Sequence, residues 1–226
     1  MAFKRKPPQG NVRRVRSTGK NIRGVVTNKT NRIVQHESYN EFKLILLLER
    51  DASVLDFISQ PEQFEFFGPD GKHHTYTPDF KVLKIDGSIE IHEVTILKRT
   101  TKENMILREQ AGRNICRERG WKYILHTEKT LPSPTEMANL STMYGFKPTA
   151  YYVEPIAQMI RRYLAKGMLD VTTLITQVSF AIQAPEVIVS GCVYHMLWRN
   201  DLIIATQGLL MIDGYPNPKT AIALRP

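Results

Sequence analysis

The sequence from Tyr76 to Thr95, YTPDFKVLKIDGSIEIHEVT, indicates how the first part of this chain folds. It holds two apolar segments separated by Asp86-Gly87, and an Asp-Gly pair between apolar segments is typical of a β-hairpin. Asp79 stands at the start of the first predicted strand, and Glu93 lies within the second. Pairing of these strands would place the two carboxylates side by side, so the segment predicts an acidic site as well as a sheet.

The acidic pair suits a divalent cation, either magnesium or manganese. Magnesium prefers oxygen ligands and keeps several of its waters when it binds to protein. Held over a phosphodiester, it can activate water and stabilise the leaving oxygen. Strand carboxylates can also be ordinary surface charge, but Glu93 lies in an apolar strand, where an uncompensated charge is costly to bury. The pattern therefore favours a metal-dependent phosphodiesterase site.

The surrounding elements predict an α/β sandwich for the first domain. Ser38-x-x-Glu41 reads as a capping box that opens a helix running to about Arg50. Strands are expected at 63–67, 73–77, 80–85 and 88–97, followed by a helix at 102–119 and a strand at 121–126. Glu41 has two interpretations, since it can cap its own helix or bring a third carboxylate to the metal. The two roles do not exclude each other.

The second half of the chain has a different pattern of predicted elements. Lys147-Pro148 marks the predicted boundary, and helices are expected at 154–166, 171–180 and 185–199. Two short strands, at 202–205 and 208–212, follow them, and this order predicts an α+β winged helix-turn-helix domain. Its charges nearly cancel, so we expect it to contact protein rather than DNA. The apolar segment Ala221–Leu224 is the candidate contact segment.

The net charge of +9 is concentrated at the start of the chain, where no acidic residue precedes Glu37. The predicted organisation is a basic flexible arm at 1–35, a nuclease domain at 36–146 and the C-terminal domain at 147–226. A basic arm is attracted to phosphate, and basic residues also open the helix that follows Glu93. The candidate DNA-binding residues are Arg13, Arg14, Arg16, Lys20, Lys98, Arg99 and Lys102.

Other classes of protein are disfavoured. The N-terminus is basic but lacks the apolar stretch of a secretory signal, and the longest apolar run, 44–48, is far too short to span a membrane. Cys116 and Cys192 lie far apart without the spacing of a metal site, as expected for buried thiols in a reducing compartment. We therefore expect a cytoplasmic protein.

The acidic residues resemble those of the PD-(D/E)xK nucleases, and their order resembles the TnsA family, the endonuclease subunits of heteromeric, Tn7-like bacterial transposases. The matching stretches are 36–42, 48–51, Gln60-Pro61, 76–80, 92–94 and 121–128. The resemblance implies a restriction-endonuclease-like fold and assigns the family's acidic positions to Glu41, Asp79 and Glu93. It also implies cleavage of the 5′, non-transferred strands at transposon ends. Its implied partners are transposon-end DNA, a DDE transposase (TnsB-like), an AAA+ ATPase (TnsC-like) and a target-selection module.

One residue departs from the nuclease pattern. Thr95 stands where those nucleases keep a lysine that orients and polarises the attacking water, and threonine brings no positive charge. Three explanations are open: Lys81 reaches in from the neighbouring strand, the metal ions suffice, or the subunit has little activity or an engineered threonine. Lys98 is a weaker candidate than Lys81, because it lies five residues after Glu93 and alternation along the strand would turn its side chain to the opposite face. Two rival functions follow, a stand-alone restriction or repair nuclease and a silent subunit that docks DNA and the ATPase.

Overall fold

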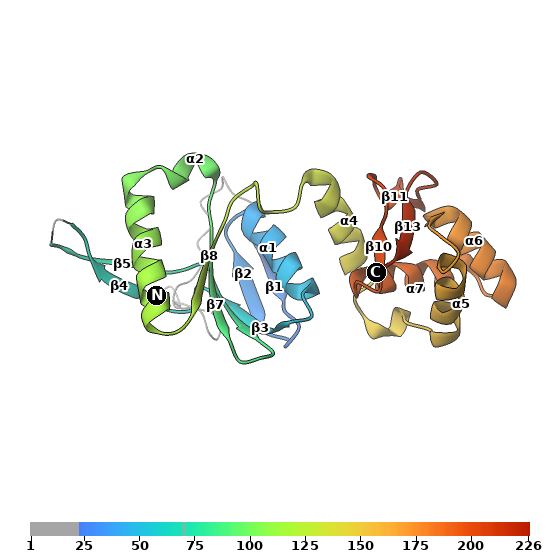
Figure 1. Ribbon diagram of the computed structural model, residues 1–226, viewed down its shortest axis with the longest axis horizontal. Helices are drawn as coiled ribbons and strands as arrows, with labels where there is room; N and C mark the ends of the chain where they lie inside the picture. Colours follow the sequence, from blue (N-terminus) through green and yellow to red (C-terminus); the bar gives the residue numbers. More distant parts are fainter. Residues whose placement is uncertain (1–22, 70) are drawn as a thin grey trace, which may run out of the picture. The chain divides into compact units, whose positions relative to one another are not determined.

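The computed structural model describes residues 23–69 and 71–226, and the chain divides into two compact units after Leu131 (Figure 1). The division comes before the predicted boundary at 146/147. The reason is a helix that the sequence analysis did not predict, α4 (Pro134–Tyr144), which belongs to the second unit. Asn139 on α4 donates a hydrogen bond to the Gly208 carbonyl and accepts one from the Leu210 N–H, so this helix is fixed to later residues.

The first unit is built on a four-stranded sheet. Its strands are β3 (Val54–Ser59), β6 (Phe80–Lys84), β7 (Ile89–Val94) and β8 (Lys122–His126), in the order β3-β6-β7-β8. β6 pairs antiparallel with both β3 and β7, whereas β7 and β8 are parallel. The predicted hairpin of β6 and β7 is confirmed, and Gly87 takes the left-handed conformation that its turn needs, with φ 83°.

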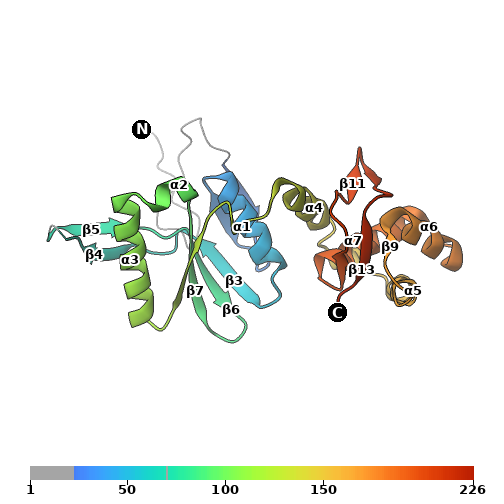
Figure 2. The ribbon, with the colours of Figure 1, turned by 45° about the horizontal axis from the view of Figure 1, so that its top comes forward.

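One helix covers each face of this sheet, as Figures 1 and 2 show. On one side α1 (Tyr39–Arg50) packs Leu44 and Ile45 into an apolar cluster with Phe80. On the other side α3 (Glu103–Glu118) packs Ala111 and Cys116 against Ile91 and Tyr123. The two layers of helix confirm the α/β sandwich, and they place the ends of both helices near the ends of β6 and β7.

The predicted arm is wrong for residues 24–35. Together with His36 they form a hairpin of β1 (Gly24–Thr27) and β2 (Ile33–His36). The side-chain oxygen of Asn28 accepts the backbone N–H groups of Thr30 and Arg32, which closes the turn, and Val34 is fully buried. Residues 1–22, including the candidates Arg13, Arg14, Arg16 and Lys20, lie outside the described residues.

Two strands form a separate ribbon instead of joining the main sheet. β4 (Phe64–Phe67) pairs antiparallel with β5 (His73–Tyr76). Phe64 and Tyr76, at the base of the ribbon, are buried against α3, with their rings in edge contact at 5.6 Å. The strand beside β6 on the side away from β7 is β3, which the sequence analysis did not predict.

The second unit continues from α4 with a short 3-10 turn, η1 (Thr149–Tyr151), and then alternates helices with short strands. The elements are α5 (Glu154–Leu164), β9 (Leu169–Asp170), α6 (Val171–Ile182), α7 (Glu186–Trp198), β10 (Leu202–Ile204), β11 (Met211–Ile212), β12 (Tyr215–Pro216) and β13 (Ala221–Leu224). Three of the strands form one antiparallel sheet in the order β10-β13-β9, while β11 and β12 form a small ribbon. The winged-helix assignment stays a prediction for this unit.

The structure corrects the interpretation of the segment Ala221–Leu224. It is β13, the middle strand of the three-stranded sheet, and Ile222 is fully buried. The error arose because β10 pairs with β13 across a long connection, whereas we expected it to pair with the segment that follows it. β13 is therefore part of the core and is not an exposed contact segment.

Helix α7 is the most buried helix of the second unit. Val189 and every residue from Gly191 to Trp198 are buried, so polar and apolar faces cannot be distinguished along most of its length. Across residues 23–69 and 71–226, no helix has the length and apolar composition that a membrane crossing requires.

Candidate active site

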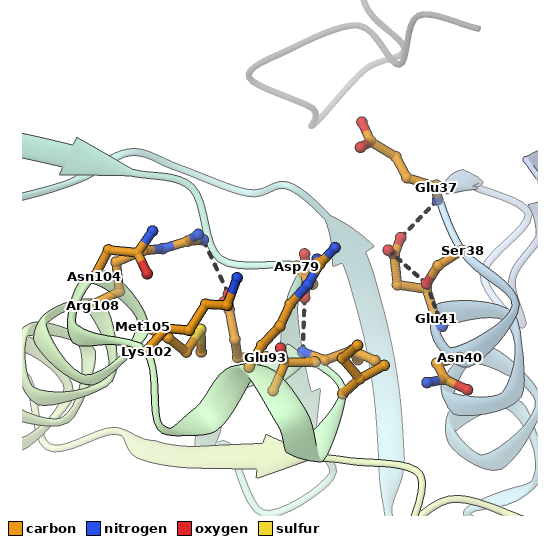
Figure 3. A pocket seen from close by; sticks show the side chains of 14 residues that line it. Glu37, Ser38, Asn40, Glu41, Asp79, Glu93, Lys102, Asn104, Met105 and Arg108 are labelled. Carbon is orange, nitrogen blue, oxygen red and sulfur yellow. Dashed lines mark hydrogen bonds and ion pairs between the residues drawn. The ribbon is translucent and has the colours of Figure 1, made fainter. Parts of the chain in front are cut away.

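A pocket of about 520 Å³ lies in the first unit, where β6 and β7 meet the first turns of α1 and α3 (Figure 3). Its acidic lining residues are Glu37, Glu41, Asp79 and Glu93. Its basic lining residues are Arg99 and Lys102, from the connection between β7 and α3 that includes the short helix α2 (Leu97–Thr100), and Arg108 on α3. The remaining lining residues are Ser38, Asn40, Val94, Thr95, Ile96, Asn104 and Met105.

Asp79 is held in place from two sides. Its backbone carbonyl accepts the N–H of Gln60 at 2.7 Å, and its Oδ2 accepts the N–H of Val94 at 2.7 Å. Gln60 has the left-handed φ of 47°, which turns the chain out of β3 and toward Asp79. Because Phe80 pairs with His92, Asp79 stands opposite Glu93 at the end of the β6–β7 ladder. The predicted pairing of these carboxylates is present.

The two oxygens of Glu93 have different surroundings. Its side chain is only 5% exposed, and Oε1 accepts a hydrogen bond from Arg108 Nη2 at 3.1 Å. Oε2 is also buried, but it has no hydrogen-bond partner among the described residues. A buried carboxylate oxygen without a partner is costly, so this atom is the one that a bound cation or donor would stabilise.

Burial and mutual repulsion shift both carboxyl groups in the same direction. Burial raises the pKa of Asp79 well above its ordinary value, and the charges of Glu93 and Glu41 raise it further. Burial likewise raises the pKa of Glu93 to about 7, although the Arg108 guanidinium acts in the opposite direction. The pair therefore accumulates negative charge only at a cost, which is the situation that a divalent cation relieves.

Residues 51–128 match the family model described as TnsA-like endonuclease N terminal. This part of the chain is a TnsA-like endonuclease domain. Asp79, Glu93, Thr95 and Arg108 lie inside the matched residues, whereas Glu41 precedes them. No curated protein matches the chain.

Glu41, which precedes the matched residues, lines the pocket but is engaged locally. Its Oε2 accepts the backbone N–H of Glu37 at 2.7 Å, and its Oε1 accepts the Ser38 hydroxyl at 2.9 Å. Ser38 Oγ in turn accepts the N–H of Glu41, so the predicted cap at the start of α1 is confirmed. Figure 3 shows the Glu41 carboxylate turned toward Glu37, on the opposite side of the pocket from Glu93.

We expect Glu41→Ala to destabilise the protein by about 0.5–2 kcal/mol, because the substitution removes both of these bonds at the helix start. Urea unfolding monitored by circular dichroism would measure this cost. The matched control is Glu136→Ala on α4, where Glu136 occupies the same place in a capping box with Ser133 and does not line the pocket. If Glu41→Ala is as stable as the parent protein, the capping role is disproved.

The carboxylates fit a magnesium site through Asp79 and Glu93. No cluster of three or more His, Cys, Asp or Glu side chains poised for a metal occurs within the described residues, and the carboxylate of Glu41 is engaged in its cap. Magnesium, however, commonly takes only one or two protein carboxylates and fills its other positions with water and substrate phosphate. The unpartnered Oε2 of Glu93 and the adjacent Asp79 meet that requirement.

The structure brings some of the predicted cations to the pocket of the TnsA-like domain and leaves others out. Arg99 and Lys102 line the pocket, as does Thr95, whose N–H donates to the His126 carbonyl. Lys98 lies exposed on α2 and is not among the lining residues.

The structure also removes Lys81 from the pocket. It pairs with Glu62 at 3.0 Å and lies over the Trp121 ring at 4.1 Å. Two residues along β6 amount to a rise of about 6.6 Å, and this carries Lys81 away from Asp79 although both can face the same side.

Arg108 is the residue of this site that the sequence analysis missed. It lies in the second turn of α3, fifteen residues after Glu93, and reaches Glu93 only because α3 packs across the sheet. The signal in the sequence was the basic composition of this helix, which did not distinguish Arg108 from the other arginines of α3.

Proposed function

We propose that this chain is a metal-dependent DNA endonuclease subunit that cuts the 5′ strands at the ends of a mobile element. The observation that supports the proposal best is the position of Asp79 and Glu93, paired in one pocket of a TnsA-like domain that basic residues also line. Carboxylates opposite cations are what a site needs to hold a metal ion and a phosphodiester together.

In this proposal the acidic and the basic residues of the pocket have separate roles. Asp79 and Glu93 would hold magnesium or manganese, which supplies an activated water and stabilises the leaving oxygen. Arg99 and Lys102 are exposed and also line the pocket, so they can bind the phosphate groups of the strand. The basic residues that precede Glu37 would add phosphate affinity that does not depend on sequence.

The proposal is tested by incubating the full-length protein and a DDE transposase with end-labelled transposon-end duplex. We expect nicks in the 5′ strands with Mg²⁺ or Mn²⁺ and none with EDTA. Metal-dependent cutting of unrelated duplexes without the transposase would favour a stand-alone nuclease instead. Binding without cutting in either metal would favour the silent docking subunit, which the threonine at position 95 keeps as an alternative.

We further propose that the second unit, with a winged-helix fold, contacts protein, in particular an AAA+ ATPase regulator. The burial of α7 supports this, because a helix enclosed over most of its length has little surface to place in a DNA groove. Large apolar side chains are instead exposed where α6 ends and α7 begins, namely Phe180 at 80% and Val187 at 73%. The nearly balanced charge of the unit also favours protein over DNA.

We expect the double substitution Phe180→Glu and Val187→Glu to abolish retention of the ATPase in a pull-down while DNA affinity stays unchanged in a gel shift. Charged side chains at the centre of an apolar contact are costly to bury. Tyr215→Glu is the matched control, since Tyr215 is 75% exposed on β12 of the same unit. Loss of DNA binding with full retention of the ATPase would contradict the assignment.

A further inference from the structure

Arg108 occupies a special position among the cations of the pocket. Among the described residues, the lysine and arginine side chains that line it are Arg99, Lys102 and Arg108, and Arg108 bonds to a carboxylate of the acidic pair. Figure 3 shows its side chain extending from α3 toward Glu93. The position that carries a lysine in the nuclease pattern is Thr95, and Lys81 is engaged with Glu62 and Trp121. Within residues 23–69 and 71–226, the ion pair that Glu93 makes is therefore with a residue of α3.

The guanidinium of Arg108 is itself held in place. It lies over the Tyr76 ring, with its central carbon 4.9 Å from the ring centroid. Tyr76 is buried and packs edge-on against Phe64, so the ring offers a fixed surface. An arginine stacked on a buried aromatic ring keeps its planar donors in a defined direction, which a flexible lysine does not do. Arg108 can therefore impose an orientation on the group that it binds.

The bond from Arg108 also makes the two carboxylate oxygens of Glu93 different from each other. Nη2 binds Oε1, and this leaves Oε2 without a partner among the residues described. A carboxylate fixed by one oxygen presents the other in a single direction. The bond from Arg108 thus acts on Glu93 as a supporting hydrogen bond acts on a metal ligand.

We propose that Arg108 is a positioning residue, which fixes Glu93 through Oε1 so that Oε2 faces the divalent cation. By doing so it brings from α3 the positive charge that Thr95 does not provide. This inference rests on the proposed metal-dependent function. It assigns to the TnsA-like domain a supporting residue that lies outside the acidic motif.

The test is Mn²⁺ binding to the full-length protein without DNA, measured from the signal of free Mn²⁺ in electron paramagnetic resonance. For Arg108→Met we expect the affinity to fall by about 10-fold or more, as when the hydrogen-bond partner of a metal ligand is removed. If Arg108 acted on the metal only through charge repulsion, Arg108→Met would bind Mn²⁺ more tightly, because removal of a nearby positive charge strengthens cation binding. Unchanged or tighter binding by Arg108→Met would therefore overturn the proposal.

Two further variants keep the test decisive. Arg113→Met is the matched control, since Arg113 also lies on α3, stacks on a tyrosine (Tyr123) and pairs with a glutamate (Glu109), but it does not line the pocket. It should bind Mn²⁺ like the parent protein. Arg108→Lys keeps the charge but loses the planar fork, so we expect an affinity between those of the parent protein and Arg108→Met. If Arg108→Met does not fold, parent-like binding by Arg108→Lys overturns the positioning role.

The outcomes separate this inference from the function on which it rests. If the parent protein binds Mn²⁺ but cuts no DNA, the proposed endonuclease function fails and the role of Arg108 in metal binding is still decided by the variants. If the parent protein cuts DNA and Arg108→Met binds Mn²⁺ normally, only the role of Arg108 fails. Absence of Mn²⁺ binding by the parent protein overturns both.

Discussion

Asp79→Ala and Glu93→Ala are each expected to abolish DNA cleavage while leaving the protein folded. Each substitution removes one of the two carboxylates that can share a metal ion in the pocket. The apolar clusters on the two faces of the sheet, which dominate stability, do not include either residue. Cleavage rates at saturating Mg²⁺ and Mn²⁺, together with a thermal melt of each variant, would test the expectation.

Glu90→Gln provides the matched control for these variants. Glu90 is a buried carboxylate on the same strand, β7, but it points to the other face of the sheet and bonds to His92 at 3.1 Å. This variant is expected to keep its cleavage activity wherever it remains folded. Cleavage at the parent rate by Asp79→Ala or Glu93→Ala in saturating metal would show that the acidic pair is not the active site.

Glu93→Gln is expected to make the metal-free protein more stable at pH 8, although it removes catalysis. Burial, together with the charge of Glu41, raises the pKa of Glu93 from 4.5 to about 7 in the folded state. The folded protein therefore binds an extra proton between these values, so stability falls as pH rises from about 4.5 to about 7. A shift of this size corresponds to a loss on the order of 3 kcal/mol, which a neutral glutamine does not suffer.

Urea unfolding in EDTA at pH 5 and pH 8 would measure this effect. The stability difference between Glu93→Gln and the parent protein should be small at pH 5 and should favour the variant at pH 8. Saturating Mg²⁺ should narrow the difference at pH 8, because a bound cation stabilises the ionised parent carboxylate. A difference that does not change between the two pH values would show that Glu93 is ionised at no cost in the folded protein.

The acidic part of the site could be predicted because it is encoded locally. Asp79 and Glu93 flank a single hairpin, and the Asp-Gly turn fixes which residues face each other. Arg108 could not be predicted, since its contact with Glu93 depends on how α3 packs across the sheet. Lys81 was chosen because alternation along the strand places it on the same face as Asp79. Alternation gives only the face and not the distance along the strand, and Lys81 pairs with Glu62 instead.

The fold was predictable where neighbours in sequence are neighbours in space. The pairing of β10 with β13 spans a long connection, and no local pattern pointed to it. Helix α4 was not predicted, although Ser133 is its cap and Pro134 its first residue, where proline is favoured. Local signals thus gave the type of many elements, while the partners of the short strands required the tertiary structure.

The central place of β13 in its sheet has a consequence for folding during synthesis. The first unit has all of its strands and helices once residue 131 has been made. The sheet of the second unit, in contrast, lacks its middle strand until residues 221–224 leave the ribosome, so β9 and β10 have no partner before then. Domains generally fold as units, and those made earlier fold first. The first unit should therefore be able to fold before β13 of the second unit has been synthesised.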